Sequence, residues 1–251
     1  MHATAPRASK VPQVTLAFWI IKIAATTLGE TAGDALSMTL QLGYALSTVI
    51  FFVCFAVAVA AQVCAKRFHP FLYWAVIVAT TTVGTTMADF ADRSLGIGYI
   101  GGSLLLLALL VAVLAAWWKT TGSISVNRID NPRDEIFYWL AILTSNTLGT
   151  ALGDFFADDS GLGFEGAALV FAALLAVIAA AYFLTELSHT LLFWAAFILT
   201  RPLGATLGDT LTKPLAEGGL NLSRINSSAL IAAFMIAAIL FTSRRPARVR
   251  H

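Results

Sequence analysis

The chain has 251 residues, of which 58% are hydrophobic and only 12% are charged, and its formal net charge is +2. Soluble domains have about 25% charged residues, so these few charges cannot cover a water-facing surface. The composition excludes an ordinary soluble domain and predicts an all-α integral membrane protein.

Taken in chain order, eight transmembrane helices are predicted, in which a helix with a polar stripe alternates with an apolar one. The first striped helix begins at Val14, and we expect it to be retained rather than cleaved as a signal peptide, because Lys22, Gly29 and Glu30 interrupt its apolar stretch. Each striped helix is followed by an apolar run suited to face lipid. These runs are Leu40–Val63, Tyr99–Trp118, Gly166–Leu184 and Ala229–Phe241.

The striped helices carry one motif, W-x9-G-x3-[GA]-D, four times. Its tryptophans are Trp19, Trp74, Trp139 and Trp194, and its aspartates are Asp34, Asp89, Asp154 and Asp209. The tryptophans are 55, 65 and 55 residues apart, which indicates four two-helix units formed by duplication of a pair. The predicted segments are a cytoplasmic tail (1–13), repeats 1 and 2 (14–126), a cytoplasmic linker (127–134), repeats 3 and 4 (135–243) and a basic cytoplasmic tail (244–251).

The distribution of lysine and arginine predicts that both termini are cytoplasmic. This orientation leaves only Arg93, Lys213 and Arg224 in the outer loops, against eleven basic residues on the inner side. Each motif tryptophan then begins its helix at the cytoplasmic interface, where aromatic belts are common. Fifteen residues at a rise of about 1.5 Å place each aspartate roughly 22 Å further along, in the outer third of the membrane.

The four aspartates and Glu30 are the candidate cation- and proton-binding residues. Polar residues at helical spacing support them and predict that the four striped helices converge on a shared interior. The supporting residues are Thr27, Thr31, Thr82, Thr85, Thr86, Asn146, Thr147, Thr150 and Thr206. Only two basic residues, Lys22 and Arg201, are expected inside the membrane as counter-charges. Five carboxylates against two cations predict that the excess is protonated or balanced by a bound cation.

Small residues in the motif favour close helix packing, and unwinding at the first glycine of each motif is the alternative. The packing glycines are Gly29, Gly33, Gly84, Gly149, Gly153, Gly204 and Gly208. Asp92 and Asp158 are expected at an outer rim, where they either attract cations or are simply solvated.

The donors on the striped helices are oxygens, without histidine or cysteine, and such a set suits a hard cation or a proton. We expect no cofactor beyond a bound divalent cation of the manganese or magnesium class. The expected partners are this cation, protons and the lipid bilayer, and nucleic acid is not expected. The sequence is also compatible with a homo-oligomer.

The motif, in its fullest form Gly29-Glu30-Thr31-Ala32-Gly33-Asp34, resembles the repeat of a bacterial family of multi-spanning proteins defined only as a repeat of unknown function. The resemblance covers nearly the whole chain and implies a four-unit bundle in the bacterial inner membrane. It carries no activity, and the fourth unit departs from it at Arg201-Pro202.

The leading functional hypothesis is a secondary, proton-coupled transporter of a small hard cation. A cation channel and a structural or partner-binding membrane protein are the alternatives. An enzyme is not expected, because no nucleophile–base pair, zinc-protease motif or phosphate-binding loop occurs.

Overall fold

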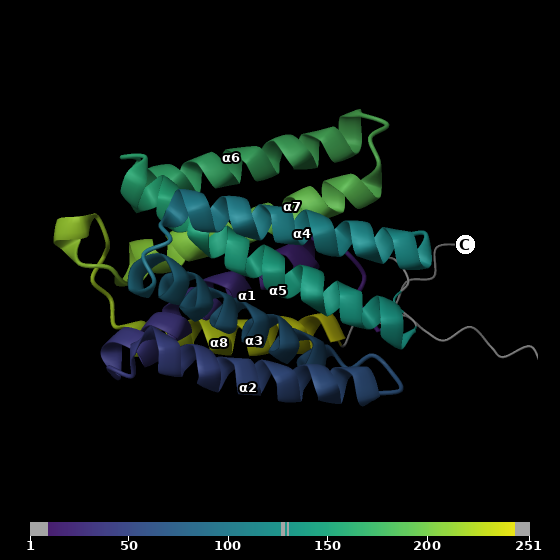
Figure 1. Ribbon diagram of the computed structural model, residues 1–251, viewed down its shortest axis with the longest axis horizontal. Helices are drawn as coiled ribbons and strands as arrows, with labels where there is room; N and C mark the ends of the chain where they lie inside the picture. Colours follow the sequence, from purple (N-terminus) through teal and green to yellow (C-terminus); the bar gives the residue numbers. More distant parts are fainter. Residues whose placement is uncertain (1–9, 127–128, 130, 244–251) are drawn as a thin grey trace, which may run out of the picture.

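The computed structural model describes residues 10–126, 129 and 131–243, and this part of the chain forms eight long helices and no strand (Figure 1). The all-helical prediction is confirmed. The helices are α1 (Leu16–Asp34), α2 (Gly43–Cys64), α3 (Pro70–Asp89), α4 (Tyr99–Thr121), α5 (Pro132–Asp154), α6 (Gly163–Leu184), α7 (His189–Thr212) and α8 (Arg224–Ser243). The predicted basic tail 244–251, most of the tail 1–13 and part of the linker 127–134 lie outside the described residues.

The four motif helices α1, α3, α5 and α7 form an inner ring, in which each helix packs against the next and α7 closes on α1. At every contact the first motif glycine faces the residue three positions before the corresponding glycine of the next helix. These contacts are Gly29 with Thr81, Gly84 with Asn146, Gly149 with Arg201, and Gly204 with Thr26. An added Cβ on Gly84 would lie 3.1 Å from a backbone nitrogen of α5, closer than an ordinary van der Waals contact, so the close approach favours glycine there.

One turn further along, the small residue before the aspartate makes the same kind of contact. Gly33 faces Thr85, Gly153 faces Ala205, and Gly208 faces Glu30. The helices run through the first motif glycines without a break, so the described structure has no unwinding at these positions.

The remaining helices form an outer layer, in which each helix covers the motif helix of the following repeat. Thus α2 packs on α3, α4 on α5, α6 on α7, and α8 on α1. The repeat pattern predicts that the two helices of a repeat form a unit, but their main packing partners belong to different repeats. The ring is therefore held together by exchanged outer helices as well as by its own contacts.

The turn after the motif aspartate carries the chain sideways to the next helix. In the first three repeats a single π-helical turn follows the aspartate, over Ala35–Thr39, Phe90–Ser94 and Phe155–Asp159. A glycine with positive φ then precedes or begins the outer helix, namely Gly43, Gly98 or Gly163. In the fourth repeat Lys213-Pro214 ends the helix instead, and a longer loop follows.

Side-chain caps fix where the motif helices begin. Thr15, His69, Asn131 and Ser188 each accept a hydrogen bond from the backbone N–H three residues later. Because α5 begins at Pro132, the last three residues of the predicted linker belong to a helix.

The tryptophan end of the inner ring is closed by aromatic side chains. The aromatic residue before each motif tryptophan contacts the tryptophan of the next helix, with ring centroids 5.5 to 6.4 Å apart. The pairs are Phe18–Trp74, Tyr73–Trp139, Tyr138–Trp194 and Phe193–Trp19. Three of these tryptophans are at most 4% exposed, so they pack within the ring and do not form an outward-facing aromatic belt.

Six of the described helices are long and apolar enough to cross a membrane, namely α2, α3, α4, α6, α7 and α8. Helices α1 and α5 are not among them. They lie in the inner ring between α3 and α7, and they carry buried charged residues such as Lys22, Glu30 and Glu135. Most large exposed apolar side chains belong to the outer layer and the turns, which leaves the bundle with an apolar outer surface.

Candidate functional site

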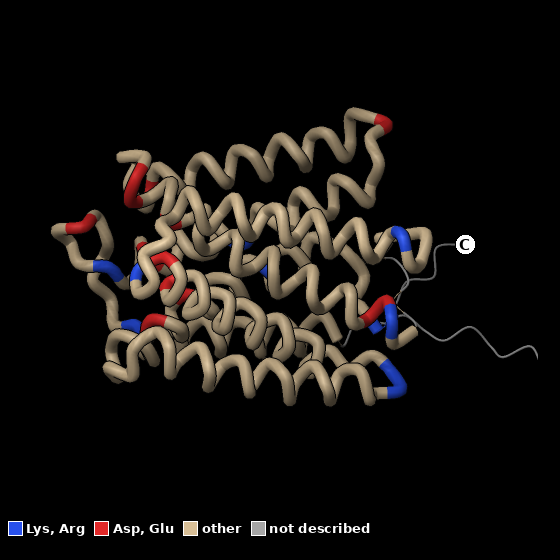
Figure 2. The backbone as a smooth tube through the Cα atoms, viewed as in Figure 1, with Lys and Arg blue, Asp and Glu red and all other residues tan. Residues whose placement is uncertain are grey.

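The four motif aspartates lie at one end of the inner ring, and each is at most 3% exposed. Acidic residues gather at this aspartate end (Figure 2). In α1, α3 and α5 the aspartate is the last helical residue, so the helix and the following turn enclose its carboxylate. Repetition of the motif around the ring therefore brings the four aspartates together at the same end of the four inner helices.

Arg93 connects the aspartates of the second and third repeats. Its Nε lies 3.1 Å from Asp89 Oδ1, and its Nη2 lies 3.7 Å from Asp154 Oδ2 and from Asp158 Oδ2. The Arg93 side chain is 31% exposed, so it lies at the boundary between the ring and its surroundings.

Lys213 connects the aspartates of the fourth and first repeats in the same way. Its Nζ lies 3.3 Å from both Asp209 Oδ1 and Asp34 Oδ2, and Arg224 Nε approaches Asp34 Oδ2 at 3.5 Å. Lys213 is just beyond the end of α7. Burial lowers its pKa, but the carboxylates of Asp209 and Asp34 outweigh this effect and raise the pKa above its ordinary value. We therefore treat Lys213 as positively charged.

The prediction that the five carboxylates outnumber the basic residues around them is wrong. Arg93, Lys213 and Arg224 had been assigned to the outer loops, but all three form ion pairs with motif aspartates. With Lys22 and Arg201 they make five basic residues against the five carboxylates, although Lys22 pairs with none of them. The physical reason is the helical spacing: Arg93 and Lys213 each follow their aspartate by four residues, which places both side chains on one face of the chain.

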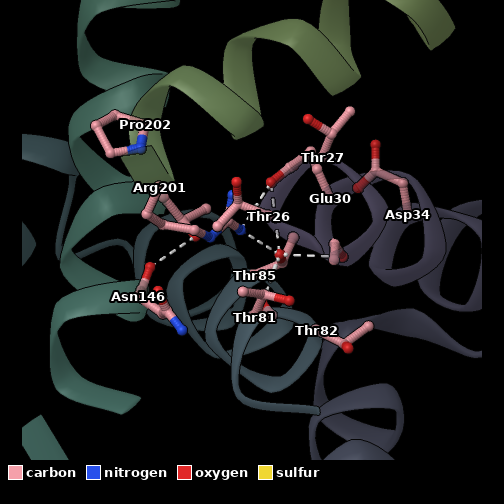
Figure 3. A network of polar contacts seen from close by, with 12 residues as sticks. Thr26, Thr27, Glu30, Asp34, Thr81, Thr82, Thr85, Asn146, Arg201 and Pro202 are labelled. Atoms are coloured by element: carbon pink, nitrogen blue, oxygen red, sulfur yellow. Dashed lines mark hydrogen bonds and ion pairs between the residues drawn. The ribbon is translucent and has the colours of Figure 1, made fainter. Parts of the chain in front are cut away.

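Glu30 forms a second layer of charge next to the aspartates. Arg201 extends from α7, and its Nη2 donates to Glu30 Oε2 at 2.9 Å and to Thr85 Oγ1 at 2.5 Å (Figure 3). A carboxylate oxygen from each of Glu30, Asp34 and Asp209 lies within 4.8 Å of the others, and all three residues are buried. We call these three residues the carboxylate cluster. Among the described residues it is the one group of three or more such ligands close enough to share an ion.

Lys22, the other predicted counter-charge, is not ion-paired with any described carboxylate. Its Nζ lies 3.4 Å from Asn146 Oδ1 and 4.1 Å from the centre of the Phe197 ring. Asn146 in turn donates from Nδ2 to Thr80 Oγ1 at 2.8 Å. The predicted polar residue Asn146 therefore meets the lysine, not the aspartates.

Most of the predicted supporting threonines hydrogen-bond to backbone carbonyls of their own helix, a common arrangement in apolar surroundings. These are Thr27, Thr31, Thr82, Thr86, Thr147, Thr150 and Thr206. Thr31 also accepts from Ser228, and Thr85 alone of the predicted set contacts Glu30 and Arg201. Side chains that bridge neighbouring helices, Thr26 and Thr81, were missed. Their signal was the position three residues before the motif glycine.

The two predicted rim acids differ in their surroundings. Asp158 is half-exposed, and besides contacting Arg93 it accepts a hydrogen bond from Tyr99 at 3.1 Å. Asp92 is buried against Gly102 of α4, and both of its oxygens lack a hydrogen-bond partner. Asp92 is therefore not part of an exposed rim.

Comparison with known proteins identifies the repeat. The family model described as Repeat of Unknown Function (DUF347) matches four times, over residues 17–68, 72–123, 137–188 and 192–247. No curated protein and no solved structure matches the chain significantly.

Proposed function

The chain belongs to the family defined by the Repeat of Unknown Function (DUF347), and we propose from its own residues that it is a membrane transporter of a small hard cation. The carboxylate cluster carries this proposal, because Glu30, Asp34 and Asp209 place three buried carboxylates within 4.8 Å of one another. Buried acids at this density are a feature of ion and proton pathways.

We propose that all eight helices cross the bacterial inner membrane with both termini in the cytoplasm. The apolar outer layer suits lipid. Helices α1 and α5 would cross too, because they lie in the inner ring between α3 and α7, which are both apolar enough to span. The basic residues of the aspartate end are ion-paired, whereas Lys66, Arg67 and Lys119 lie at the opposite end, in agreement with the positive-inside rule.

Oxygen donors favour a hard cation such as Mn²⁺ or Mg²⁺ as substrate. In the described arrangement Lys213 occupies the position between Asp34 and Asp209 that a metal ion would take. We propose that an entering cation displaces the Lys213 ammonium group from these carboxylates. On release, Lys213 returns or the carboxylates take up protons, and the latter would couple transport to a proton gradient.

Closure of the ring favours a transporter over a channel. Aromatic side chains fill the tryptophan end, and Arg201 extends from α7 to Glu30 on α1 and Thr85 on α3. A channel needs a continuous wet path, whereas a transporter needs a site closed on one side at a time. The ion pairing of Glu30 and all four motif aspartates favours a second candidate, a structural membrane protein in which these acids serve only to join helices.

The test is cation uptake into proteoliposomes that contain the purified full-length chain. The assay presents Mn²⁺, Mg²⁺, Ca²⁺ and Na⁺ separately, with and without a pH gradient. We expect Asp34→Asn and Asp209→Asn to lower uptake of the transported ion at least tenfold. Asp159→Asn, which removes an exposed acid at the same end, should leave uptake unchanged.

Size-exclusion profiles and thermal unfolding must first establish that the variants are folded. If the parent transports no cation of the panel, or if both cluster variants transport like the parent, the proposal fails. Variants that change only thermal stability would then support the structural role.

A further inference from the structure

The layer next to the carboxylate cluster contains more positive than negative charge. Lys22 on α1 and Arg201 on α7 are both fully buried. Glu30 is the one described carboxylate that forms an ion pair with either of them, and it pairs with Arg201. The two basic residues therefore have one described counter-ion, which contacts only Arg201, and an unbalanced buried charge is strongly unfavourable.

The same layer lacks hydrogen-bond acceptors. Arg201 uses Nη2 for Glu30 and Thr85, but its Nε and Nη1 have no partner. Lys22 has one weak acceptor, Asn146 Oδ1 at 3.4 Å, although an ammonium group has three N–H donors. Buried donors of this kind are almost always satisfied in folded proteins, by water or by an ion where the protein supplies no acceptor.

Lys22 and Arg201 each lie against α5 on the inner face of the ring, where α1, α5 and α7 converge. The Lys22 ammonium group lies against Phe197, one helical turn before Arg201 on α7, and against Asn146 on α5 (Figure 3 shows Asn146 and Arg201). The Arg201 side chain passes close over Gly149 of α5, where an added Cβ would come within 2.5 Å of its Cβ. The unpartnered Nε and Nη1 of Arg201 therefore lie inside the bundle, close to α5.

We propose that Lys22 and Arg201 bind a small monovalent anion of halide size between them. Such an anion supplies both the missing acceptor and the missing negative charge, whereas water supplies only the acceptor. The ring face of Phe197 and the amide oxygen of Asn146 keep the lysine in place. This site adjoins the carboxylate cluster through the Arg201–Glu30 ion pair but does not depend on cation transport.

The test measures thermal unfolding of the purified full-length chain in detergent, as gluconate is replaced by chloride or bromide at constant ionic strength. The melting temperature of the parent should rise with halide and saturate, by about 3–6 °C at a tenfold excess over the dissociation constant. Lys22→Met, which keeps the length of the side chain but removes its charge, should lose this dependence and melt higher than the parent in gluconate.

Lys213→Met is the matched control. It removes a lysine from the aspartate end, so it should lower the melting temperature yet keep the halide dependence of the parent. The proposal is overturned if the parent is indifferent to halide, or if Lys22→Met responds to halide as the parent does. A response of equal size to sulfate would also overturn it, since it would indicate a general salt effect.

Discussion

The buried ion pair between Glu30 and Arg201 allows a quantitative prediction. At 2.9 Å and an effective dielectric constant of about 20, the two charges attract by about 6 kcal/mol. Much of this attraction offsets the loss of hydration, but removal of one partner leaves the other charged and buried, at a cost of about 3–5 kcal/mol. Glu30→Gln and Arg201→Met should therefore each lower the melting temperature of the detergent-solubilised chain by on the order of 10 °C.

The second buried cation in this layer, Lys22, predicts that the two substitutions lower the melting temperature by different amounts. Glu30→Gln leaves Arg201 and Lys22 without any described counter-ion in contact, whereas Arg201→Met leaves one positive and one negative group, Lys22 and Glu30. Glu30→Gln should be the more destabilising, and the double variant should be less destabilised than Glu30→Gln alone. A Glu30→Gln protein that melts with the parent would refute this description of the layer.

Three further predictions concern packing and membrane insertion. Gly84→Ala should lower the melting temperature by several degrees, because its Cβ would lie 3.1 Å from a neighbouring backbone nitrogen, whereas Gly101→Ala, whose nearest contact would be 3.5 Å away, should not. Tyr73→Phe should cost about 1 kcal/mol in thermal unfolding, since it removes a 2.6 Å hydrogen bond between two buried hydroxyls. In single-cysteine variants, Cys54 in the middle of α2 should resist a membrane-impermeant maleimide, while Cys64 at the end of α2 should react only in inside-out vesicles. Labelling of Cys54 from water, or of Cys64 from the outer side, would contradict the proposed insertion.

Much of the fold could be predicted because the motif is repeated. Equal spacing from tryptophan to aspartate predicts that the four acids lie at one end of the bundle, and a polar stripe on each of four helices predicts a shared interior. The exchange of outer helices could not be predicted, since it depends on the turn after the aspartate and not on helix periodicity. Burial of the tryptophans was missed because residues such as Trp74 occur both in lipid-facing belts and in aromatic cores.

The gathering of the acids was predicted from the sequence, but the basic residues that pair with them were not. Arg93 and Lys213 appear in the sequence four residues after an aspartate, which is the spacing of an ion pair on a helix. Their assignment to solvated loops hid that signal, because the π-helical turn at Arg93 and the Pro214 loop at Lys213 both continue the chain close to the ring. The second partner of each cation, Asp154 or Asp34, comes from the next repeat and depends on ring closure.

Binding of Mn²⁺ to Lys213→Met protein in lipid nanodiscs tests the central claim most directly. Without the Lys213 ammonium group, Asp34 and Asp209 have one counter-charge fewer and should bind Mn²⁺ more tightly. Electron paramagnetic resonance measures the free Mn²⁺, which should be lower with this variant than with the parent at the same total Mn²⁺. We predict at least tenfold tighter binding than in the parent, about 1.4 kcal/mol, with one ion per chain, and loss of binding when both aspartates are also changed to asparagine. A folded Lys213→Met protein that binds Mn²⁺ no better than the parent would contradict the assignment of this cluster as a cation site.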